Sequence, residues 1–359
     1  MNKYNNLRED VSELYTKLTK WQYRYALKYA FLHPNIKINP MKLDEKVNEE
    51  YSYFLKHKKM NSKAKSKFEI TAEENLYITK VYRAALEGSM LKLYKNAPHL
   101  KTIKKEQFKI GETKAEWQIP FDAIKNQVIL YLHGGGYNLG SIKAARGFTS
   151  LIANNTKRKI LVIDYRLAPE YQYPSALEDS LAVYKWLLVE GYNPEDIIIA
   201  GDSAGGGLVL ALLLKLKDLE EELPNSAILF SPWTDLTFSG KSFFENIPTD
   251  PIIAELNLYR FVKNYLNLKT EKVTNPFVSP LFGEFKGLPP LLFIVSTTEM
   301  LYDDAKRIAD KAKAAGVEIQ WEEWKDMLHV FPQFCYGTEI QESEDEHQKV
   351  RGFIIQRLS

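Results

Sequence analysis

Residues 197–214 read IIIAGDSAGGGLVLALLL, and this stretch contains a short turn between two apolar segments. The isoleucines predict a buried strand, and the apolar run after the glycines predicts a helix. Between them lies the pattern G-x-S-x-G, formed by residues 201–205. So short a turn strains the serine backbone and leaves no room for side chains beside it. We therefore expect Ser203 at the carboxyl end of a sheet, where the amino end of the helix favours negative charge.

Other short runs of β-branched residues lie on both sides of this turn, and segments with helical spacing separate most of them. Apolar strands that alternate with helices are typical of a mostly parallel sheet covered on both faces, so we predict an α/β fold. The chain is expected to close with a helix near 343–358. Strands are expected at 128–132, 160–164, 197–200, 227–230 and 291–295, with an antiparallel piece over 108–120 before them and a late strand over 317–324.

Residues 1–105 have a different character. Apolar residues recur at helical spacing over 11–32 and 71–96, and no strong strand is apparent. We predict an N-terminal helical region over 1–105 and a sheet-containing domain over 106–359. Residues 238–275 contain no convincing strand either, so this segment is expected to leave the sheet and fold beside the N-terminal helices.

The composition, with 45% apolar and 26% charged residues, is that of an ordinary soluble globular protein. The first residues, MNKYNNLREDVSEL, contain no apolar core of a signal peptide, and the longest apolar stretch is too short to span a bilayer. The single cysteine, Cys335, excludes an intrachain disulfide and is interpreted as a small buried residue. These features predict a cytoplasmic protein.

Charge is divided unevenly along the chain. Residues 1–105 carry 22 Lys and Arg against 11 Asp and Glu, whereas 106–359 carry 26 against 35. The polar stretch KHKKMNSKAKSK (56–67) is expected to be flexible. A solvated, lysine-rich helical surface explains the basic region, and weak attraction to an anionic lipid surface is the alternative. No recognition motif for nucleic acid accompanies the charge.

A glycine-rich loop, HGGGYNLG (133–140), follows the first central strand. Acyl transfer by a serine passes through a tetrahedral oxyanion, which needs preorganised N–H donors. Backbone N–H groups supply them only where no Cβ blocks the approach, which favours Gly134 and Gly135, with the N–H of Ala204 as the third donor. His133 is interpreted as holding this loop through hydrogen bonds rather than as a base.

A nucleophilic serine needs an adjacent base that an acid orients. After a G-x-S-x-G turn the partners follow in the order acid, then histidine. Of the six histidines, four precede Ser203, and the polar run around His347 predicts a solvated helix. His329, in a loop after the late strand and near Asp326, is therefore the candidate base.

Several motifs follow one another along the chain, namely HGGGY, DYRLAPE (164–170), GDSAGG, SPWTDLT (231–237) and SPLFGEFKGLPPLLFIVSTTEMLYDDA (279–305). Together they resemble the hormone-sensitive-lipase-like family of α/β-hydrolases, over about residues 106–340. The resemblance implies an α/β-hydrolase fold, carboxylesterase or lipase activity, and a helical cap built from the N-terminal region and an insertion after a late strand.

The resemblance also implies the acid. In the family an aspartate in a D-P-L-x-D pattern follows the apolar strand, and here Glu299 stands in its place, with Met300 at the proline position. A carboxylate one methylene longer can still orient an imidazole, so Glu299 is the expected acid and Asp303 the alternative. Asp303 and Asp304 are otherwise expected to start and cap the next helix. No histidine lies near these acids at ligand spacing, so no metal site is expected.

Other residues near the motifs have expected roles. Arg166 and Glu170 are expected to form buried or half-buried charge contacts beside the site, and Asp202 to help hold that region. Positions next to the motifs suggest Tyr137, Trp233 and Leu301 as substrate-binding residues, although each is also a normal core residue.

The sequence therefore predicts a serine carboxylesterase for short- to medium-chain esters of small molecules, with no cofactor. An amidase, lactonase or acyltransferase would use the same residues. A non-catalytic small-ligand receptor on the same fold is a further alternative, but gibberellin-receptor-like relatives of the family lack the working histidine, which His329 supplies here. Acyl-chain length is not determined, and a homodimer remains open.

Overall fold

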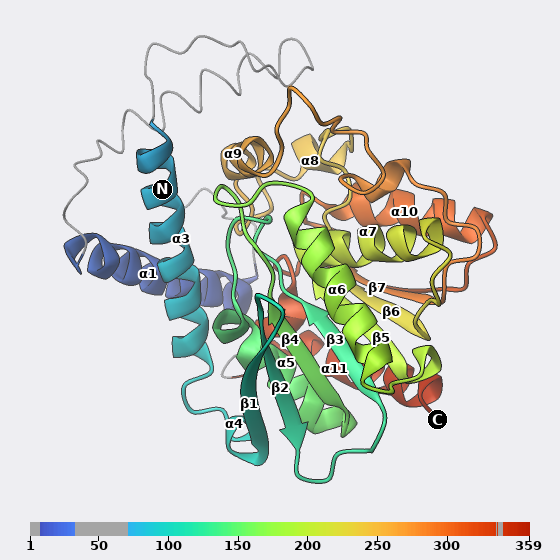
Figure 1. The fold of residues 1–359 in the computed structure, drawn as a ribbon. Coiled ribbons are helices and arrows are strands. Elements are labelled where there is room, and N and C mark those ends of the chain that lie inside the picture. Colours follow the sequence, from blue (N-terminus) through green and yellow to red (C-terminus); the bar gives the residue numbers. More distant parts are fainter. Residues whose placement is uncertain (1–7, 33–70, 335, 337–339) are drawn as a thin grey trace.

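The computed structural model describes residues 8–32, 71–334, 336 and 340–359, in which eight strands form one sheet with helices on both faces (Figure 1). The strands are β1 (Ile103–Ile110), β2 (Thr113–Pro120), β3 (Val128–Leu132), β4 (Lys159–Asp164), β5 (Ile197–Asp202), β6 (Ser226–Phe230), β7 (Leu291–Ser296) and β8 (Ile319–Trp324). The helices are α1 (Glu9–Leu32), α3 (Ala72–Leu93), α4 (His99–Thr102), α5 (Ile142–Thr156), α6 (Ser175–Val189), α7 (Ala204–Asp218), α8 (Ser242–Glu245), α9 (Glu255–Tyr265), α10 (Tyr302–Ala314) and α11 (Gln341–Arg357), with short 3₁₀ turns at η1 (Pro194–Asp196), η2 (Pro280–Phe282) and η3 (Phe331–Phe334).

The strand order is β1-β2-β4-β3-β5-β6-β7-β8, and the run from β4 to β8 is parallel. The hairpin of β1 and β2 joins the β4 edge in antiparallel orientation. This confirms the predicted α/β fold with a mostly parallel sheet. Because parallel strands end at the same edge, the loops after β3, β5, β6 and β7 meet there, which is where ligands bind in sheets of this kind.

Alternate residues of the central strands are buried on opposite faces. On β3, Leu130 and Leu132 belong to a core cluster that includes residues of α6, α7 and α10. Ile129 and Tyr131 belong to the other cluster, with residues of α1, α3, α5 and α11. Figure 1 shows α6 in front of the sheet and α5 and α11 behind it. Full burial of each large aliphatic side chain contributes about 1.5–3 kcal/mol, so the strand ends are held from both sides.

The first strand lies partly inside the region that was expected to be only helical. β1 begins at Ile103, directly after the single turn of α4, so the absence of a strand from 1–105 was predicted wrongly at its last residues. The sequence IKKEQFKI alternates half-buried and exposed side chains along most of its length. So polar an edge strand gives little strand signal, and pairing with β2 along its whole length provides the stabilisation.

Helices α1 and α3 pack against each other at the carboxyl edge of the sheet (Figure 1). A Cβ added to Gly88 would lie 2.3 Å from the ring of Tyr25, so the small residue lets the two helices approach closely. α9 lies against α3, where the Asn75 side-chain amide donates to Asn264 Oδ1 at 2.7 Å. The described part of 238–275 thus contacts the N-terminal helices, while the division at residue 105 into two domains remains a prediction.

Some expectations concern residues outside the described ranges. These are the flexible stretch 56–67 and the burial of Cys335. Among the helices of the described ranges, none combines the length and the apolar character that a membrane-crossing segment needs.

Candidate active site

Ser203 occupies the turn between β5 and α7, as the G-x-S-x-G pattern predicts. Its backbone has φ 53° and ψ −121°, a combination that is rare and strained for a residue with a side chain. The Ser203 N–H donates to the carbonyl oxygen of Phe230 at 2.8 Å, and the N–H of Trp233 donates to that of Ser203 at 2.9 Å. The loop after β6 therefore holds the strained turn in place.

Gly205 allows α7 to begin directly against the end of β3. A Cβ at this position would lie 2.0 Å from the carbonyl oxygen of Leu132 and 2.5 Å from that of His133. Only glycine fits so close to another backbone. The N–H groups in the first turn of α7 have no partner within the helix, and Ala204 is its first residue. A negative charge that develops beside Ser203 is favoured at this helix end.

His329 and Glu299 form a close pair beside the carboxyl end of the sheet. His329 Nδ1 lies 2.6 Å from Glu299 Oε2, and both side chains are buried. His329 Nε2 is also buried and has no hydrogen-bond partner among the described residues. His329 and Ser203 line the same cavity. The arrangement offers a hydroxyl and an imidazole that a carboxylate orients through its other nitrogen.

The surroundings of His329 make it more basic than usual. Burial by itself lowers the pKa of His329, because it disfavours the charged ring. The hydrogen bond to Glu299 and the negative charges of Glu299, Asp250 and Asp202 outweigh this effect, so the pKa of His329 is raised. An imidazole of this kind is suited to taking a proton from a neighbouring hydroxyl.

Of the two carboxylates considered for the acid position, Glu299 is the one that contacts the imidazole. Its second oxygen accepts hydrogen bonds from the Ser231 hydroxyl at 2.8 Å and from the Ser296 N–H at 2.6 Å. These donors fix the carboxylate toward His329. Asp303 instead accepts from the N–H of Ser242 at 3.0 Å.

The expectation that Asp303 and Asp304 cap α10 is wrong. Both lie in its first turn, but the N-cap position is Leu301, without a side-chain cap bond. Asp304 is buried and accepts from the N–H groups of Thr234 and Asp235 at 2.8 and 2.7 Å. The buried loop after β6 needs acceptors for these N–H groups, so Asp304 binds this loop to α10, while Asp303 binds the start of α8 through Ser242.

Asp250 is a buried carboxylate that sequence reasoning missed. Its Oδ1 accepts from the N–H groups of Ile252 and Ile253, each at 3.0 Å, and its Oδ2 accepts from that of Met300 at 2.9 Å. Burial raises the pKa of Asp250 to about 6, although these hydrogen bonds and His329 oppose the increase. No motif marks this residue in the sequence, because only the fold brings its loop against the residues that follow β7.

The glycine loop after β3 presents different donors from those predicted. The N–H of Gly134 donates to Asp202 Oδ1 at 2.9 Å, so it is not free to bind an oxyanion and its assignment as a donor is wrong. Gly135 has φ 117°, which only glycine adopts readily. Gly135 and Gly136 line the cavity, and neither N–H donates to another group within the described part of the chain. The third glycine of the motif was the missed candidate.

Side chains around the loop keep it in this position. His133 Nδ1 lies 2.8 Å from the carbonyl oxygen of Gly134, and the His133 ring stacks on Tyr165 with 4.4 Å between ring centroids. The hydroxyl of Tyr131 donates to Asp202 Oδ1 at 2.7 Å. His133 and Asp202 thus hold the loop, in agreement with their expected roles.

Ser203 and His329 open onto a cavity of about 1060 Å³. We call the side formed at the ends of β3 and β5 and after β8 the sheet wall; it consists of His133, Gly134, Gly135, Gly136, Leu139, Gly140, Asp202, Ser203, His329, Val330 and Gln333. The opposite side, the helical wall, comes from α1, α3, α9 and the segment that leads into α9. It is mostly apolar and aromatic, and consists of Thr19, Gln22, Tyr23, Ala26, Tyr77, Ile78, Val81, Tyr82, Ala85, Leu86, Met90, Ile252, Ile253, Ala254, Asn257, Leu258 and Phe261.

The three residues suggested for substrate binding do not line this cavity. Tyr137, Trp233 and Leu301 are almost fully buried in the core on the α7 side of the sheet. Tyr137 has φ 60° and stacks on Tyr265 at 4.1 Å, so its ring packs away from the cavity. Their positions next to motifs reflect core packing, and most of the apolar residues that line the cavity come instead from the helical wall.

Charged residues of the DYRLAPE stretch make structural contacts. Arg166 pairs with Asp179 at 2.8 Å, and Glu170 pairs with Arg83 of α3 at 2.7 Å. Arg83 also donates to the carbonyl oxygen of Asn138, in the glycine loop, at 2.7 Å. The expected half-buried charge contacts are confirmed, and Arg83 additionally ties α3 to the loop that faces Ser203.

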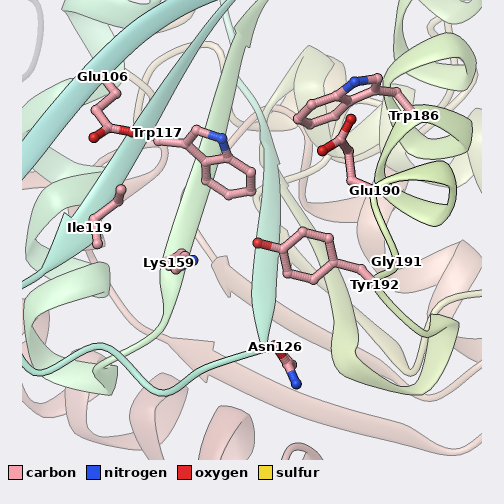
Figure 2. Close-up of a pocket in the computed structure, with 9 residues that line it drawn as sticks. All are labelled: Glu106, Trp117, Ile119, Asn126, Lys159, Trp186, Glu190, Gly191 and Tyr192. Atoms are coloured by element: carbon pink, nitrogen blue, oxygen red, sulfur yellow. The ribbon is translucent and has the colours of Figure 1, made fainter.

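A second, smaller pocket of about 260 Å³ lies between the β1–β2 hairpin and α6, and Figure 2 shows its nine lining residues. Trp117, Trp186 and Tyr192 form its aromatic sides, with ring centroids of Trp117 and Tyr192 6.0 Å apart. The labelled residues include no serine, cysteine or histidine. This pocket therefore lacks the serine and histidine that the predicted chemistry needs, and the Ser203 cavity is the candidate active site.

Comparisons with known proteins agree with this geometry. A family model described as an alpha/beta hydrolase fold matches residues 129–333. An esterase from Acinetobacter venetianus is 36% identical over 252 residues, which cover 70% of this chain and 82% of that protein. An acetyl-hydrolase from Streptomyces hygroscopicus is 37% identical over 222 residues, 62% of this chain and 73% of that protein.

Solved structures give the same result. The crystal structure of an esterase from the bacterial hormone-sensitive lipase family superimposes with a TM-score of 0.73 at 33% identity, and the match covers 90% of this chain and all of that chain. The chain belongs to the hormone-sensitive-lipase-like family of α/β-hydrolases and is an esterase-type member of it.

Proposed function

We propose that this α/β-hydrolase is a serine carboxylesterase that cleaves short- to medium-chain esters through an acyl-enzyme, with Ser203 as nucleophile, His329 as base and Glu299 as acid. The single observation that carries the proposal is the state of His329. One ring nitrogen is held by Glu299, and the other is buried without a partner in the described residues, in a cavity that Ser203 also lines.

In the first half of the reaction, His329 Nε2 takes the hydroxyl proton of Ser203 as Oγ attacks the ester carbonyl carbon. Glu299 keeps the ring oriented and stabilises the imidazolium. The carbon–oxygen bond to the alcohol then breaks, and the alcohol leaves with the proton from His329. The raised pKa of His329 favours the charged form that this step produces.

The oxyanion of the tetrahedral intermediate needs donors that are already in place. We assign them to the N–H groups of Gly135, Gly136 and Ala204. Gly134 is replaced in this set because Asp202 accepts its N–H. Ala204 adds the positive end of the α7 dipole.

In the second half, water replaces the alcohol in the same position. His329 takes a proton from the water as it attacks the acyl carbon, and returns it to Ser203 as the acid leaves. These steps consume one ester and one water and release one alcohol and one carboxylic acid. They need only side chains and backbone groups of this chain.

The size and lining of the cavity support the substrate class. A volume of about 1060 Å³ is more than an acetyl group fills, and the helical wall offers mostly apolar contacts for a longer chain. The acetyl-hydrolase of Streptomyces hygroscopicus, by its name, acts on acetyl groups. We therefore include both short and medium acyl chains in the proposal.

The test is hydrolysis of p-nitrophenyl esters from acetate to palmitate by wild type and a Ser203→Ala variant. We expect activity with a maximum at short or medium length, and its loss in the variant. Undiminished activity of the variant would refute the mechanism. Added alcohols and amines, with analysis of products, distinguish hydrolysis from acyl transfer, and amide and lactone substrates test the remaining alternatives.

Weak association with anionic lipid is a separate part of the proposal. It rests on the basic character of residues 1–105, which carry 22 Lys and Arg against 11 Asp and Glu. Co-sedimentation with vesicles that contain phosphatidylserine, but not with neutral vesicles, is the expected result at low salt. Equal partition to both vesicle types would remove this part and leave the esterase proposal intact.

A further inference from the structure

Arg260 on α9 is a buried cation without a partner. The residue is 6% exposed, and none of its three guanidinium nitrogens has a hydrogen-bond partner in the described part of the chain. The guanidinium carbon lies 5.0 Å from the ring centroid of Tyr82 and 5.5 Å from that of Phe261. Such cation–π contacts only partly compensate for the cost of burying an unpaired ion.

The charge is not relieved by loss of a proton. Burial lowers the pKa of Arg260, but a guanidinium stays protonated in proteins. A group that destabilises the folded protein and has no internal partner is typical of a site whose partner arrives with a ligand. A carboxylate or phosphate is the natural partner, because either accepts two parallel hydrogen bonds from a guanidinium.

Arg260 lies beside the mouth of the active-site cavity. Tyr82 and Phe261, the rings that contact it, belong to the helical wall, as does Asn257 one turn earlier on α9. Tyr82 is 38% exposed, so it lies where the cavity meets solvent. For an anion in the cavity to reach the guanidinium, the partly exposed ring of Tyr82 has to turn aside.

The charged residues that line the cavity would not repel an anion at the helical wall. Among the described residues, those that line the cavity include no lysine, arginine or glutamate. Asp202 is the one acidic residue among these described lining residues, and it already accepts hydrogen bonds from Tyr131 and Gly134. Arg260 is thus a buried cation next to the helical wall, and the described lining residues offer no free carboxylate that would oppose an anion there.

We propose that Arg260 binds an anionic group, a carboxylate or a phosphate, at the end of the substrate remote from the ester carbonyl. The preferred substrates are then esters with an anionic tail, with the apolar chain along the helical wall and the reacting carbonyl at Ser203. This inference rests on the proposed esterase function and names its substrate class.

The experiment compares esters of equal length that differ only in the charge of the tail. Monomethyl esters of dicarboxylic acids, from succinate to sebacate, are compared with methyl esters of the corresponding monocarboxylic acids. Acetate esters of ω-hydroxyalkyl phosphates, with the acetate esters of alkanols of equal length as their neutral counterparts, test phosphate in the same way. We expect kcat/KM to be about 10- to 100-fold higher for the anionic member at the best length, mainly through a lower KM.

Arg260→Gln should remove this preference and leave kcat/KM for the neutral esters close to wild type. Arg260→Lys keeps the charge but loses the paired hydrogen bonds, so it should retain part of the preference. Lys263→Gln removes one positive charge from the same helix and is the matched control, with the preference expected to stay. A variant that loses anionic and neutral esters equally would overturn the inference, because such a loss indicates a structural role.

Two further measurements do not depend on the activity of the variant. Arg260→Gln should raise the melting temperature, because it removes a buried unpaired charge. Free alkanoates should inhibit wild-type hydrolysis of a neutral ester competitively, and more strongly than alkanols of equal length. Normal turnover of neutral esters without any preference for anionic ones would refute this inference alone, whereas the absence of Ser203-dependent turnover would refute the esterase proposal.

Discussion

The sheet wall and the helical wall of the cavity differ in how their polar groups are satisfied. On the sheet wall, Asp202 accepts two hydrogen bonds, and beside it Glu299 receives three. On the helical wall, Arg260 is buried beside the lining rings with none among the described residues. The carboxylates next to the catalytic residues are therefore fixed by hydrogen bonds before substrate binds. Arg260, which we assign to substrate recognition, would gain its hydrogen-bond partner only from the substrate.

This difference has a physical basis. Chemical steps require atoms held within fractions of an ångström, and strand ends fixed by a two-sided core provide that rigidity. Recognition of a tail allows more variation in position, and side chains on packed helices are sufficient. Variants on the sheet wall should therefore reduce turnover of every ester, and variants on the helical wall should change which ester is preferred.

The largest effect is expected from Ser203→Ala. Loss of the nucleophile should reduce kcat by about 10⁴–10⁶-fold for all esters, by the precedent of serine hydrolases. The melting temperature should not fall, because alanine still fits the turn. Stopped-flow and steady-state assays with p-nitrophenyl butyrate measure the loss, and a residual rate within tenfold of wild type would contradict the assignment.

Glu299→Gln should follow, with a loss of about 10⁴-fold in kcat, because the neutral amide neither orients the reactive tautomer of His329 nor stabilises its charged form. Asp303→Asn is the matched control, since Asp303 was the other candidate acid and contacts Ser242. Its kcat should remain close to wild type. The opposite ranking of the two variants would make Asp303 the acid.

Val81→Phe tests the helical wall. Val81 lines the cavity on α3, so a phenyl ring there should shorten the space for the chain. We expect kcat/KM for long esters to fall about 10-fold or more, and that for acetate to stay unchanged. Val189→Phe, at a site that is 84% exposed, is the control for the same substitution outside the cavity. An equal loss of kcat/KM for all chain lengths would contradict the proposal that the helical wall determines which ester is preferred.

The smallest effect is expected in the pH profile. Catalysis needs neutral His329, so kcat/KM should increase with pH through the pKa of this residue, which the Glu299 hydrogen bond and nearby carboxylates raise despite burial. The charge of Asp250 helps to raise the pKa of His329. Asp250→Asn should therefore lower that pKa and move the acid limb of the profile to lower pH. A shift in the opposite direction would exclude this electrostatic role.

Several features of the protein could be predicted from local sequence. The turn around Ser203, the central strands and the helices between them follow from short-range patterns of glycine, β-branched residues and helical spacing. Family resemblance pointed to Glu299, which the structure brings to His329. These predictions succeeded because each depends on backbone geometry within a few residues, or on a motif of fixed order.

Other features depended on contacts between distant segments. Gly134 and Gly136 are equivalent in the motif, and only the approach of the Asp202 side chain distinguishes them. Tyr137 and Trp233 stand beside motifs, yet the positive φ of one and the packing of both direct them into the core. Asp250 comes from a loop without any motif and reaches the residues after β7 only in the folded chain.

By itself, the sequence determined the fold class, the strained serine turn and the order of the candidate nucleophile, acid and base. Local backbone preferences and hydrophobic periodicity are sufficient for these. The tertiary structure decided which N–H groups remain free, which residues line the cavity, and that Arg260 is buried beside it without a partner in the described chain. The burial of a residue and its hydrogen bonds depend on neighbours from distant parts of the chain. They therefore cannot be predicted from a short stretch of sequence.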